Sequence, residues 1–207
     1  MYKYLKRFYD ILFSLLFLIL ITPFFLVIVF LQLVFNGFPI FYFGIRTGKD
    51  EKEFKIYKFR TMVKNAEQKG GFTTGKNDHR ITKFGKILRL TKIDEIPQLI
   101  NILKGEMSFI GPRPELPFYT KQYNEEEKVI LTVRPGITDY SSIKFINLDQ
   151  EVGSVEADKV YLEKIFKQKN QLRLKYVNEI SLHTDLKIFF ITIKKVLIKI
   201  FSFGKIR

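Results

Sequence analysis

The chain has 207 residues and no cysteine, and its 35 lysines and arginines outnumber 21 acidic residues to give a formal charge of +14. That length suits one domain with its own core, and the absence of cysteine excludes disulfides and thiolate metal sites. The charge favours anionic partners, namely nucleic acid, phosphate esters or an acidic membrane surface.

The first predicted element is an apolar helix near the N-terminus. No charged residue occurs from Ile11 to Ile45. As a straight helix, Ile11 to Phe35 would be about 37 Å long, enough to cross a hydrocarbon core of about 30 Å. The segment is too long for a signal peptide and lacks a cleavage site of the Ala-x-Ala type. A simple spanning anchor and a re-entrant hairpin are the alternatives.

Two features favour the re-entrant hairpin. Pro23 removes a backbone donor and clashes with the preceding turn, so a sharp kink is expected at Thr22-Pro23, where Thr22 would help to satisfy the freed carbonyls. Basic residues flank both ends of the segment: Lys3, Lys6, Arg7, Arg46, Lys49 and Lys52. The cytoplasmic ends of membrane segments are usually basic. Both flanks of this segment follow that rule if both remain in the cytoplasm. Asp10 is expected to pair with Lys6 or Arg7.

The rest of the chain predicts an α/β fold that is rich in helices and has a small sheet. β-Branched and aromatic residues indicate strands, a polar glycine-containing stretch indicates a loop, and apolar spacing with terminal signals indicates helices. In chain order we expect strands at 40–44 and 54–59, a loop at 63–78 with a short helix, helices at 81–90 and 94–103, a turn at 133–138, and helices at 154–177 and 185–201.

The last predicted helix, from Asp185 to Phe201, is amphipathic. Its lysines gather on roughly one face: Lys187, Lys194, Lys195 and Lys199. Such a helix is typical of the membrane interface, and a plain core helix is the alternative.

Asp94 and Glu95 are the most informative pair of residues. Pro97 is tolerated only in a first helical turn, so the pair is predicted at a helix N-terminus. Free N–H groups and the helix dipole there favour anions, so Asp94 is expected to remain ionised and a phosphate to dock nearby. Adjacent helical residues point about 100° apart, so one carboxylate would be a nucleophile or metal ligand and the other a base. The alternative is an N-capping Asp followed by a solvent-facing Glu.

Basic residues around this pair are candidates for phosphate binding. Arg113 lies between two prolines and Arg134 precedes Pro135-Gly136, and rigid flanks suit bidentate recognition of phosphate by a guanidinium. An arginine of this kind, taken alone, is more often a solvated charge. The full set of candidates is Lys58, Arg60, Thr61, Arg89, Arg113 and Arg134.

Several motifs occur in one order along the chain: Lys6-Arg7-x-x-Asp10, Lys55-Ile-Tyr-Lys-Phe-Arg-Thr-Met62, Arg80-Ile-Thr-Lys-Phe-Gly85, Ile93-Asp-Glu-Ile-Pro-Gln-Leu99, Gly111-Pro-Arg-Pro114 and Arg134-Pro-Gly-Ile-Thr138. In this order they resemble the bacterial sugar transferases, the monotopic phosphoglycosyl transferases that start glycan assembly on a polyprenol carrier. The resemblance covers Lys3 to about Leu197. It divides the chain into a re-entrant membrane region, 1–38, and a membrane-associated catalytic domain, 39–207.

The resemblance implies a mechanism and a location. Asp94 would attack the β-phosphorus of a UDP-sugar, UMP would leave, and undecaprenyl phosphate would attack the sugar-phosphoryl aspartate. Glu95 would handle protons or position the metal and acceptor, and Mg²⁺ would bridge Asp94 and the diphosphate. Arg89, Arg113 and Arg134 would bind phosphates. The implied location is the cytoplasmic face of the bacterial inner membrane, among anionic lipids.

The sequence departs from the common family pattern after Ile137-Thr138, where many members carry Gly-Trp-Ala-Gln and this chain continues with Asp139. It also has Gly44 where many carry glutamine. The first departure leaves the donor sugar open, as do the glycan pathway and the oligomeric state, a homodimer included. The alternatives are a transferase that moves only the sugar and releases UDP, and a non-catalytic membrane scaffold. Nucleic acid is not expected as a partner, because no helix-turn-helix, zinc finger or RNA-binding aromatic motif is present.

Overall fold

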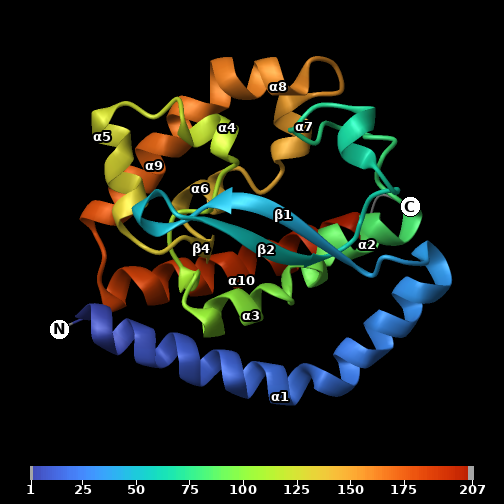
Figure 1. Ribbon diagram of the computed structural model, residues 1–207, viewed down its shortest axis with the longest axis horizontal. Coiled ribbons are helices and arrows are strands. Elements are labelled where there is room, and N and C mark those ends of the chain that lie inside the picture. The colour runs from blue at the N-terminus through green and yellow to red at the C-terminus, as the bar shows by residue number, and fades with distance from the viewer. Residues whose placement is uncertain (1, 205–207) are drawn as a thin grey trace.

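The computed structural model describes residues 2–204, in which helices predominate around two small two-stranded sheets (Figure 1). The predicted helix-rich fold with a small sheet is confirmed. Four clusters of buried apolar side chains fill the spaces between the elements, and one of them joins the N-terminal helix to a β-hairpin.

The N-terminal helix α1 (Tyr2–Asn36) is continuous and has Pro23 inside it. It changes direction along its length and curves beneath the rest of the molecule (Figure 1). The Thr22 hydroxyl donates to the Leu18 carbonyl at 2.6 Å, which strengthens the turn before the proline. The predicted helix-break-helix is therefore replaced by one bent helix, because a single missing N–H bends a helix without interrupting it. Among residues 2–204, α1 alone is long and apolar enough to cross a membrane.

The charged residues at the start of α1 bind the rest of the protein and not one another. Asp10 is buried and accepts hydrogen bonds from Ser108 Oγ (3.0 Å) and the Phe109 amide (3.1 Å). Lys6 forms an ion pair with Asp185. Arg7 donates to the carbonyls of Ile102 (2.5 Å) and Leu103 (2.8 Å) at the end of helix α3 (Gln98–Lys104). The expected pairing of Asp10 with Lys6 or Arg7 is wrong.

A β-hairpin lies across the middle of the molecule. Strands β1 (Phe41–Thr47) and β2 (Glu53–Phe59) are antiparallel, with Phe41 opposite Phe59, and the short 3₁₀ helix η1 (Lys49–Glu51) lies between them. Phe59 is buried and packs against Phe25 of α1, with 5.1 Å between the ring centroids. Both predicted strands are confirmed, and both are longer than expected. The 3₁₀ helix η2 (Ala66–Lys69) follows within the predicted loop.

Two helices and the turn between them follow that loop. Helix α2 (Lys83–Thr91) begins after Thr82, whose hydroxyl accepts from the Gly85 amide at 2.9 Å. The chain then forms the 3₁₀ turn η3 (Ile93–Glu95), and α3 ends at Gly105, whose φ of 82° suits glycine. The predicted helix 94–103 thus begins as a 3₁₀ turn, with Pro97 preceding the α-helix proper.

A short parallel pair of strands, which the sequence did not predict, holds the Gly111-Pro-Arg-Pro114 turn. Strands β3 (Ser108–Ile110) and β4 (Gly136–Thr138) pair directly. A Cβ added to Gly136 would lie 2.1 Å from the Gly111 amide nitrogen, so the close approach requires glycine. The predicted turn 133–138 therefore contains a strand. Between the strands lie α4 (Pro117–Thr120), α5 (Glu125–Lys128) and η4 (Val129–Thr132).

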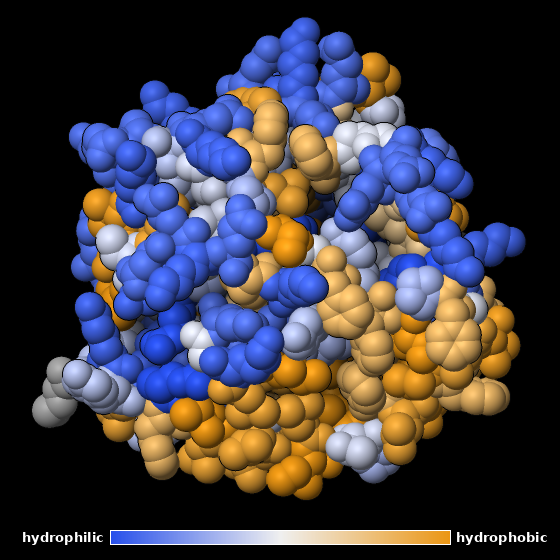
Figure 2. Space-filling view, in the orientation of Figure 1, coloured by the Kyte–Doolittle hydropathy of each residue, from blue (hydrophilic) through white to orange (hydrophobic). Residues whose placement is uncertain are grey.

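The C-terminal part is helical: α6 (Tyr140–Lys144), α7 (Leu148–Val152), α8 (Ala157–Val160), the π-helix η5 (Tyr161–Phe166), α9 (Lys167–Asn178) and α10 (Leu182–Gly204). On α10, Ile188 is completely buried, whereas Phe190 and Leu197 are exposed. Helix α10 thus packs into the core on one face, and its other face is apolar and exposed. Figure 2 shows apolar side chains gathered along the side where α1 runs and polar side chains on the opposite side.

Candidate active site

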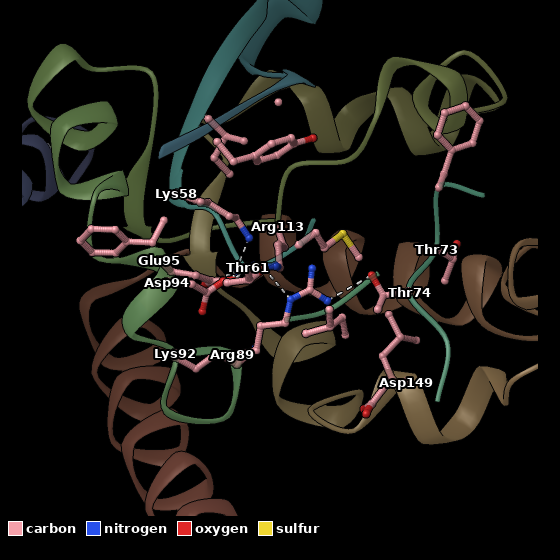
Figure 3. Close-up of a pocket in the computed structure, with 18 of the residues that line it drawn as sticks. Lys58, Thr61, Thr73, Thr74, Arg89, Lys92, Asp94, Glu95, Arg113 and Asp149 are labelled. Carbon is pink, nitrogen blue, oxygen red and sulfur yellow. Dashed lines mark hydrogen bonds and ion pairs between the residues drawn. The ribbon is translucent and has the colours of Figure 1, made fainter. Parts of the chain in front are cut away.

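Asp94 and Glu95 lie in the η3 turn between α2 and α3, and both side chains are buried. Lys92 starts this turn in the left-handed conformation, with a φ of 61°. The two carboxylates line an open cavity of about 1680 Å³. Figure 3 shows them close together, with basic side chains from other elements around them.

Glu95 is held by two cations. Lys58, from β2, donates to Glu95 Oε1 at 3.0 Å. Arg113 contacts both oxygens, with its Nη1 3.0 Å from Oε2 and its Nη2 bonded to Oε1. Burial alone would raise the pKa of Glu95, but Arg113 and Lys58 outweigh it and hold that pKa well below its usual range. Glu95 is therefore a permanent anion that positions these two cations.

Asp94 has a different environment. Its Oδ1 atom is buried and has no hydrogen-bond partner within the described part of the chain. Burial, and then the charge of Glu95, raise the pKa of Asp94. The raised pKa is opposite to the effect expected from a helix N-terminus, because burial and the charge of Glu95 dominate at Asp94. The pair also lies in a 3₁₀ turn and not in the first turn of a long helix. An orphaned carboxylate oxygen in a cavity is free to bind a cation or to attack an electrophile.

Arg89 extends the cationic lining on the other side of Asp94. Its Nε donates to Thr61 Oγ1 at 2.8 Å and its Nη1 to Thr74 Oγ1 at 3.3 Å (Figure 3). Both partners are neutral hydroxyls, so its charge remains available for an anion. Gly85 lets α2 approach this region, since a Cβ there would lie 2.1 Å from the Thr61 carbonyl oxygen.

The turn that carries Arg113 is fixed on both sides. Arg113 Nη1 donates to the Ile137 carbonyl at 2.6 Å, and its backbone amide donates to Asp139 Oδ2 at 3.3 Å. Asp139 is completely buried and also accepts from the Ser142 amide at 2.7 Å, which caps α6. Asp139, at which the sequence departs from the common pattern, thus contacts the site through its hydrogen bond with the backbone amide of Arg113.

Two of the predicted phosphate ligands are used elsewhere. The Arg60 guanidinium donates to backbone carbonyls at the end of α1 and beyond it, namely those of Asn36, Gly37, Pro39 and Met62. Arg134 is exposed, its Nε donates to the Gly105 carbonyl at 2.8 Å, and it does not line the cavity. The structure therefore brings together Lys58, Thr61, Arg89, Arg113, Asp94 and Glu95, and leaves Arg134 outside.

The sequence profile of the bacterial sugar transferases matches residues 1–199. The chain belongs to this family. Bacterial sugar transferases that resemble it include the UDP-N-acetylgalactosamine-undecaprenyl-phosphate N-acetylgalactosaminephosphotransferase of Aeromonas hydrophila, which is 33% identical over 199 residues covering 95% of this chain and 44% of the relative.

Two further relatives show the range of lengths among the bacterial sugar transferases. The uncharacterized sugar transferase EpsL of Bacillus subtilis is 38% identical over 162 residues, which cover 78% of this chain and 72% of the relative. The UDP-glucose:undecaprenyl-phosphate glucose-1-phosphate transferase of Klebsiella pneumoniae is 36% identical over 193 residues, or 92% of this chain and 39% of the relative. The chain therefore spans less than half the length of the Aeromonas and Klebsiella relatives.

The structure adds cavity residues that the sequence did not single out as site residues. Thr74 comes from the loop before α2, and Lys92 from the η3 turn. Lys195 and Lys199 come from α10, about a hundred residues later, and all four line the same cavity. The sequence pattern predicted four lysines on roughly one face of α10, whereas the packing of α10 turns Lys195 and Lys199 toward the cavity and leaves Lys187 and Lys194 exposed.

One carboxylate of this bacterial sugar transferase, that of Asp94, has the free oxygen that a Mg²⁺ ligand would need. No cluster of three or more potential metal ligands occurs within residues 2–204. Magnesium commonly binds through one or two carboxylates together with substrate phosphates and water. The free Oδ1 of Asp94 suits that mode, whereas Glu95 is already bound by Arg113 and Lys58.

Proposed function

We propose that this protein transfers a sugar-1-phosphate from a UDP-sugar to undecaprenyl phosphate, with release of UMP, as the first membrane step of glycan assembly. The observation that carries the proposal is the free Oδ1 atom of buried Asp94. It lies in a cavity whose lining includes Lys58, Arg89 and Arg113. The names of the Aeromonas and Klebsiella relatives specify the same donor and acceptor classes.

Two displacements at one phosphorus atom account for the reaction. In the first, an oxygen of Asp94 bonds to the β-phosphorus of the donor, the bond to the bridging oxygen breaks, and UMP leaves. In the second, a phosphate oxygen of undecaprenyl phosphate bonds to that phosphorus, and the Asp94 carboxylate is released. The product is a polyprenyl diphosphosugar.

The other site residues stabilise charge and orient the reactants. Arg89 lines the cavity, and its Nε donates a hydrogen bond to Thr61. Arg89 forms no ion pair with an acidic residue of the described structure, so its charge is available for the diphosphate of the UDP-sugar. Lys58 and Arg113 lie on the Glu95 side of the nucleophile, where they would stabilise charge developing on the transferred phosphoryl group. Mg²⁺ would be held by Asp94 and would neutralise part of the diphosphate charge. Glu95 fixes both cations and so acts as a positioning residue.

We also propose that residues 1–38 form a re-entrant membrane region and 39–207 the catalytic domain, on the cytoplasmic face. The exposed apolar surface of α1 supports membrane association, because only 11% of its most apolar window is buried within the protein. The bend of α1 and the basic residues that precede Ile11 and follow Ile45 support the re-entrant path.

Nucleotide release tests the proposed reaction. Detergent-solubilised protein is incubated with Mg²⁺, undecaprenyl phosphate and, separately, UDP-N-acetylgalactosamine, UDP-glucose and other UDP-sugars. We expect UMP with one donor and none from Asp94→Asn. Release of UDP would indicate transfer of the sugar alone, and no nucleotide across a broad panel from folded protein would favour a non-catalytic scaffold.

A further inference from the structure

Helix α10 presents a set of residues to the cavity that the proposed chemistry does not use. Thr192, Lys195, Val196 and Lys199 all line the cavity, and their spacing places them on one helical face. Ile188, one turn earlier, is completely buried, which fixes this face toward the protein. The packing of α10 therefore turns Lys195 and Lys199 toward the inside of the protein.

A third lysine approaches them from the η3 turn. Lys92 lines the same cavity (Figure 3) and is close enough to Lys199 to lower its pKa, together with burial, which contributes more. Lys199 Nζ donates to the Ile146 carbonyl at 2.7 Å. Within residues 2–204, no carboxylate lies within ion-pair distance of these three lysines. Asp149 also lines this part of the cavity and opposes their charge.

This lysine group, Lys92, Lys195 and Lys199, lines the same cavity as Asp94. Lys92 is two residues before Asp94. The outward face of α10 is apolar and exposed, with residues at helical spacing: Leu186, Phe190, Ile193, Leu197 and Phe201. A helix with its side chains is about 10 Å thick. One lipid molecule could therefore contact both faces of α10, with its headgroup near the lysines and its first isoprene units on the apolar side chains.

We propose that the lysine group binds the phosphate monoester of the lipid acceptor while its chain lies on the apolar surface beside α10. This inference rests on the proposed function. The reaction brings two anionic substrates to one nucleophile, and Arg89, Arg113 and Lys58 already serve the donor side. Three lysines that have no ion-pair partner among the described residues border the cavity beside α10 and form a second anion site. The acceptor is the substrate that must come from the membrane.

The test separates the two half-reactions in full-length protein. Lys195→Gln, Lys199→Gln and the double variant are compared with Lys194→Gln, a matched control whose exposed lysine does not line the cavity. The UMP burst without acceptor reports the first half-reaction. The KM for undecaprenyl phosphate at saturating donor reports the second.

We expect the double variant to raise the acceptor KM about tenfold, the loss typical of one or two charge-assisted hydrogen bonds, with the UMP burst and donor KM unchanged. Asp149→Asn should lower the acceptor KM, because it removes the opposing charge. Lys195 makes no hydrogen bond or ion pair among the described residues, so its variant should fold normally.

Three outcomes would overturn the inference. They are an unchanged acceptor KM, a loss of the UMP burst, and an equal rise in KM for Lys194→Gln, which would indicate a general effect of charge on membrane binding. Absence of UMP from the wild-type protein would contradict the proposed function itself, whereas normal UMP release with an unchanged acceptor KM contradicts only the acceptor site.

Discussion

Asp94 and Glu95 are neighbours in the chain, yet their surroundings give them different chemistry. Glu95 is surrounded by Arg113 and Lys58, which lower its pKa, whereas burial and Glu95 raise the pKa of Asp94. Burial also lowers the pKa of Lys58 to about 8, although Glu95 opposes this effect. A single arginine that bridges Glu95 and the Ile137 carbonyl therefore organises the site.

The first prediction concerns that arginine. Arg113→Lys keeps the charge but cannot bond both oxygens of Glu95 and the Ile137 carbonyl at once. We expect kcat/KM to fall about 10- to 100-fold, the size of one or two charge-assisted hydrogen bonds. Steady-state UMP release measures it. Arg134→Lys, outside the cavity, is the matched control, and an equal loss in both variants would contradict the assignment.

At the scale of elements, the sequence predicted most helices and strands but not how distant segments meet. The hairpin strands, α2 and α10 follow from local patterns. The β3–β4 pair was missed because each strand has three residues and its partner lies about 28 residues away. Asp10 was assigned a local ion pair because its partners, Ser108 and Phe109, are far along the chain.

The sequence correctly indicated that a residue lines the cavity where a rigid stretch of chain fixes the position of that residue. Arg113 lies in the cavity because prolines flank it and strand pairing holds its turn. Arg134 carried the same signal of a rigid flank, and Arg60 was a candidate at the end of a strand. The structure places backbone carbonyls against both, which no local pattern reveals.

Helix α1 provides the second prediction. Pro23→Ala restores one backbone hydrogen bond and removes the clash with the preceding turn, so α1 should straighten and shift toward a spanning path. The chain has no cysteine, so single cysteines at positions 4 and 38 can be labelled from each side of the membrane. We expect both to be labelled from one side in the wild type. Unchanged labelling in Pro23→Ala would contradict the role of the proline.

Helix α9 provides the third prediction, through Glu115. This carboxylate is 3.0 Å from Lys169 Nζ and 2.5 Å from Arg173 Nη2, and Arg173 is completely buried. Glu115→Gln leaves both cations buried without a charge partner, so we expect the free energy of unfolding to fall by about 3–5 kcal/mol. Thermal or denaturant unfolding in detergent measures it, and a loss below about 1 kcal/mol would contradict a structural role.

The ion pairs of Glu115 with Lys169 and Arg173 also predict that the stability of the protein depends on pH. Burial would raise the pKa of Glu115, but Lys169 and Arg173 outweigh it and hold the pKa far below its usual range. The stabilisation is therefore complete above the unfolded-state value of about 4.3 and is lost as pH falls below it. The difference in stability between wild type and Glu115→Gln should shrink in acid. A constant difference from pH 7 to pH 3 would contradict this account.

On the scale of the whole molecule, apolar and polar surfaces lie on opposite sides (Figure 2). The exposed apolar side chains of α1 are much more numerous than those of a typical soluble surface, and α10 adds to them. Hydrophobic burial is insensitive to salt, whereas attraction of the +14 chain to anionic lipid is screened within about 3 Å at 1 M salt. We therefore expect charge to attract the protein to the membrane and the apolar surface to hold it there.

The fourth prediction follows from that distinction. The protein should remain with the membrane pellet after washing with 1 M salt or alkaline carbonate, and only detergent should release it. Immunoblots of pellet and supernatant measure this. Release by salt alone would show that charge, and not the apolar surface, holds the protein.

In the proposed mechanism, Asp94 becomes covalently attached to the sugar phosphate. Intact-mass spectrometry of the protein, incubated with Mg²⁺ and its UDP-sugar without acceptor, detects this attachment. We expect a mass increase equal to one sugar-phosphoryl group, absent in Asp94→Asn and lost when undecaprenyl phosphate is added. UMP formation that requires the acceptor, with no adduct detected under rapid quenching, would contradict it.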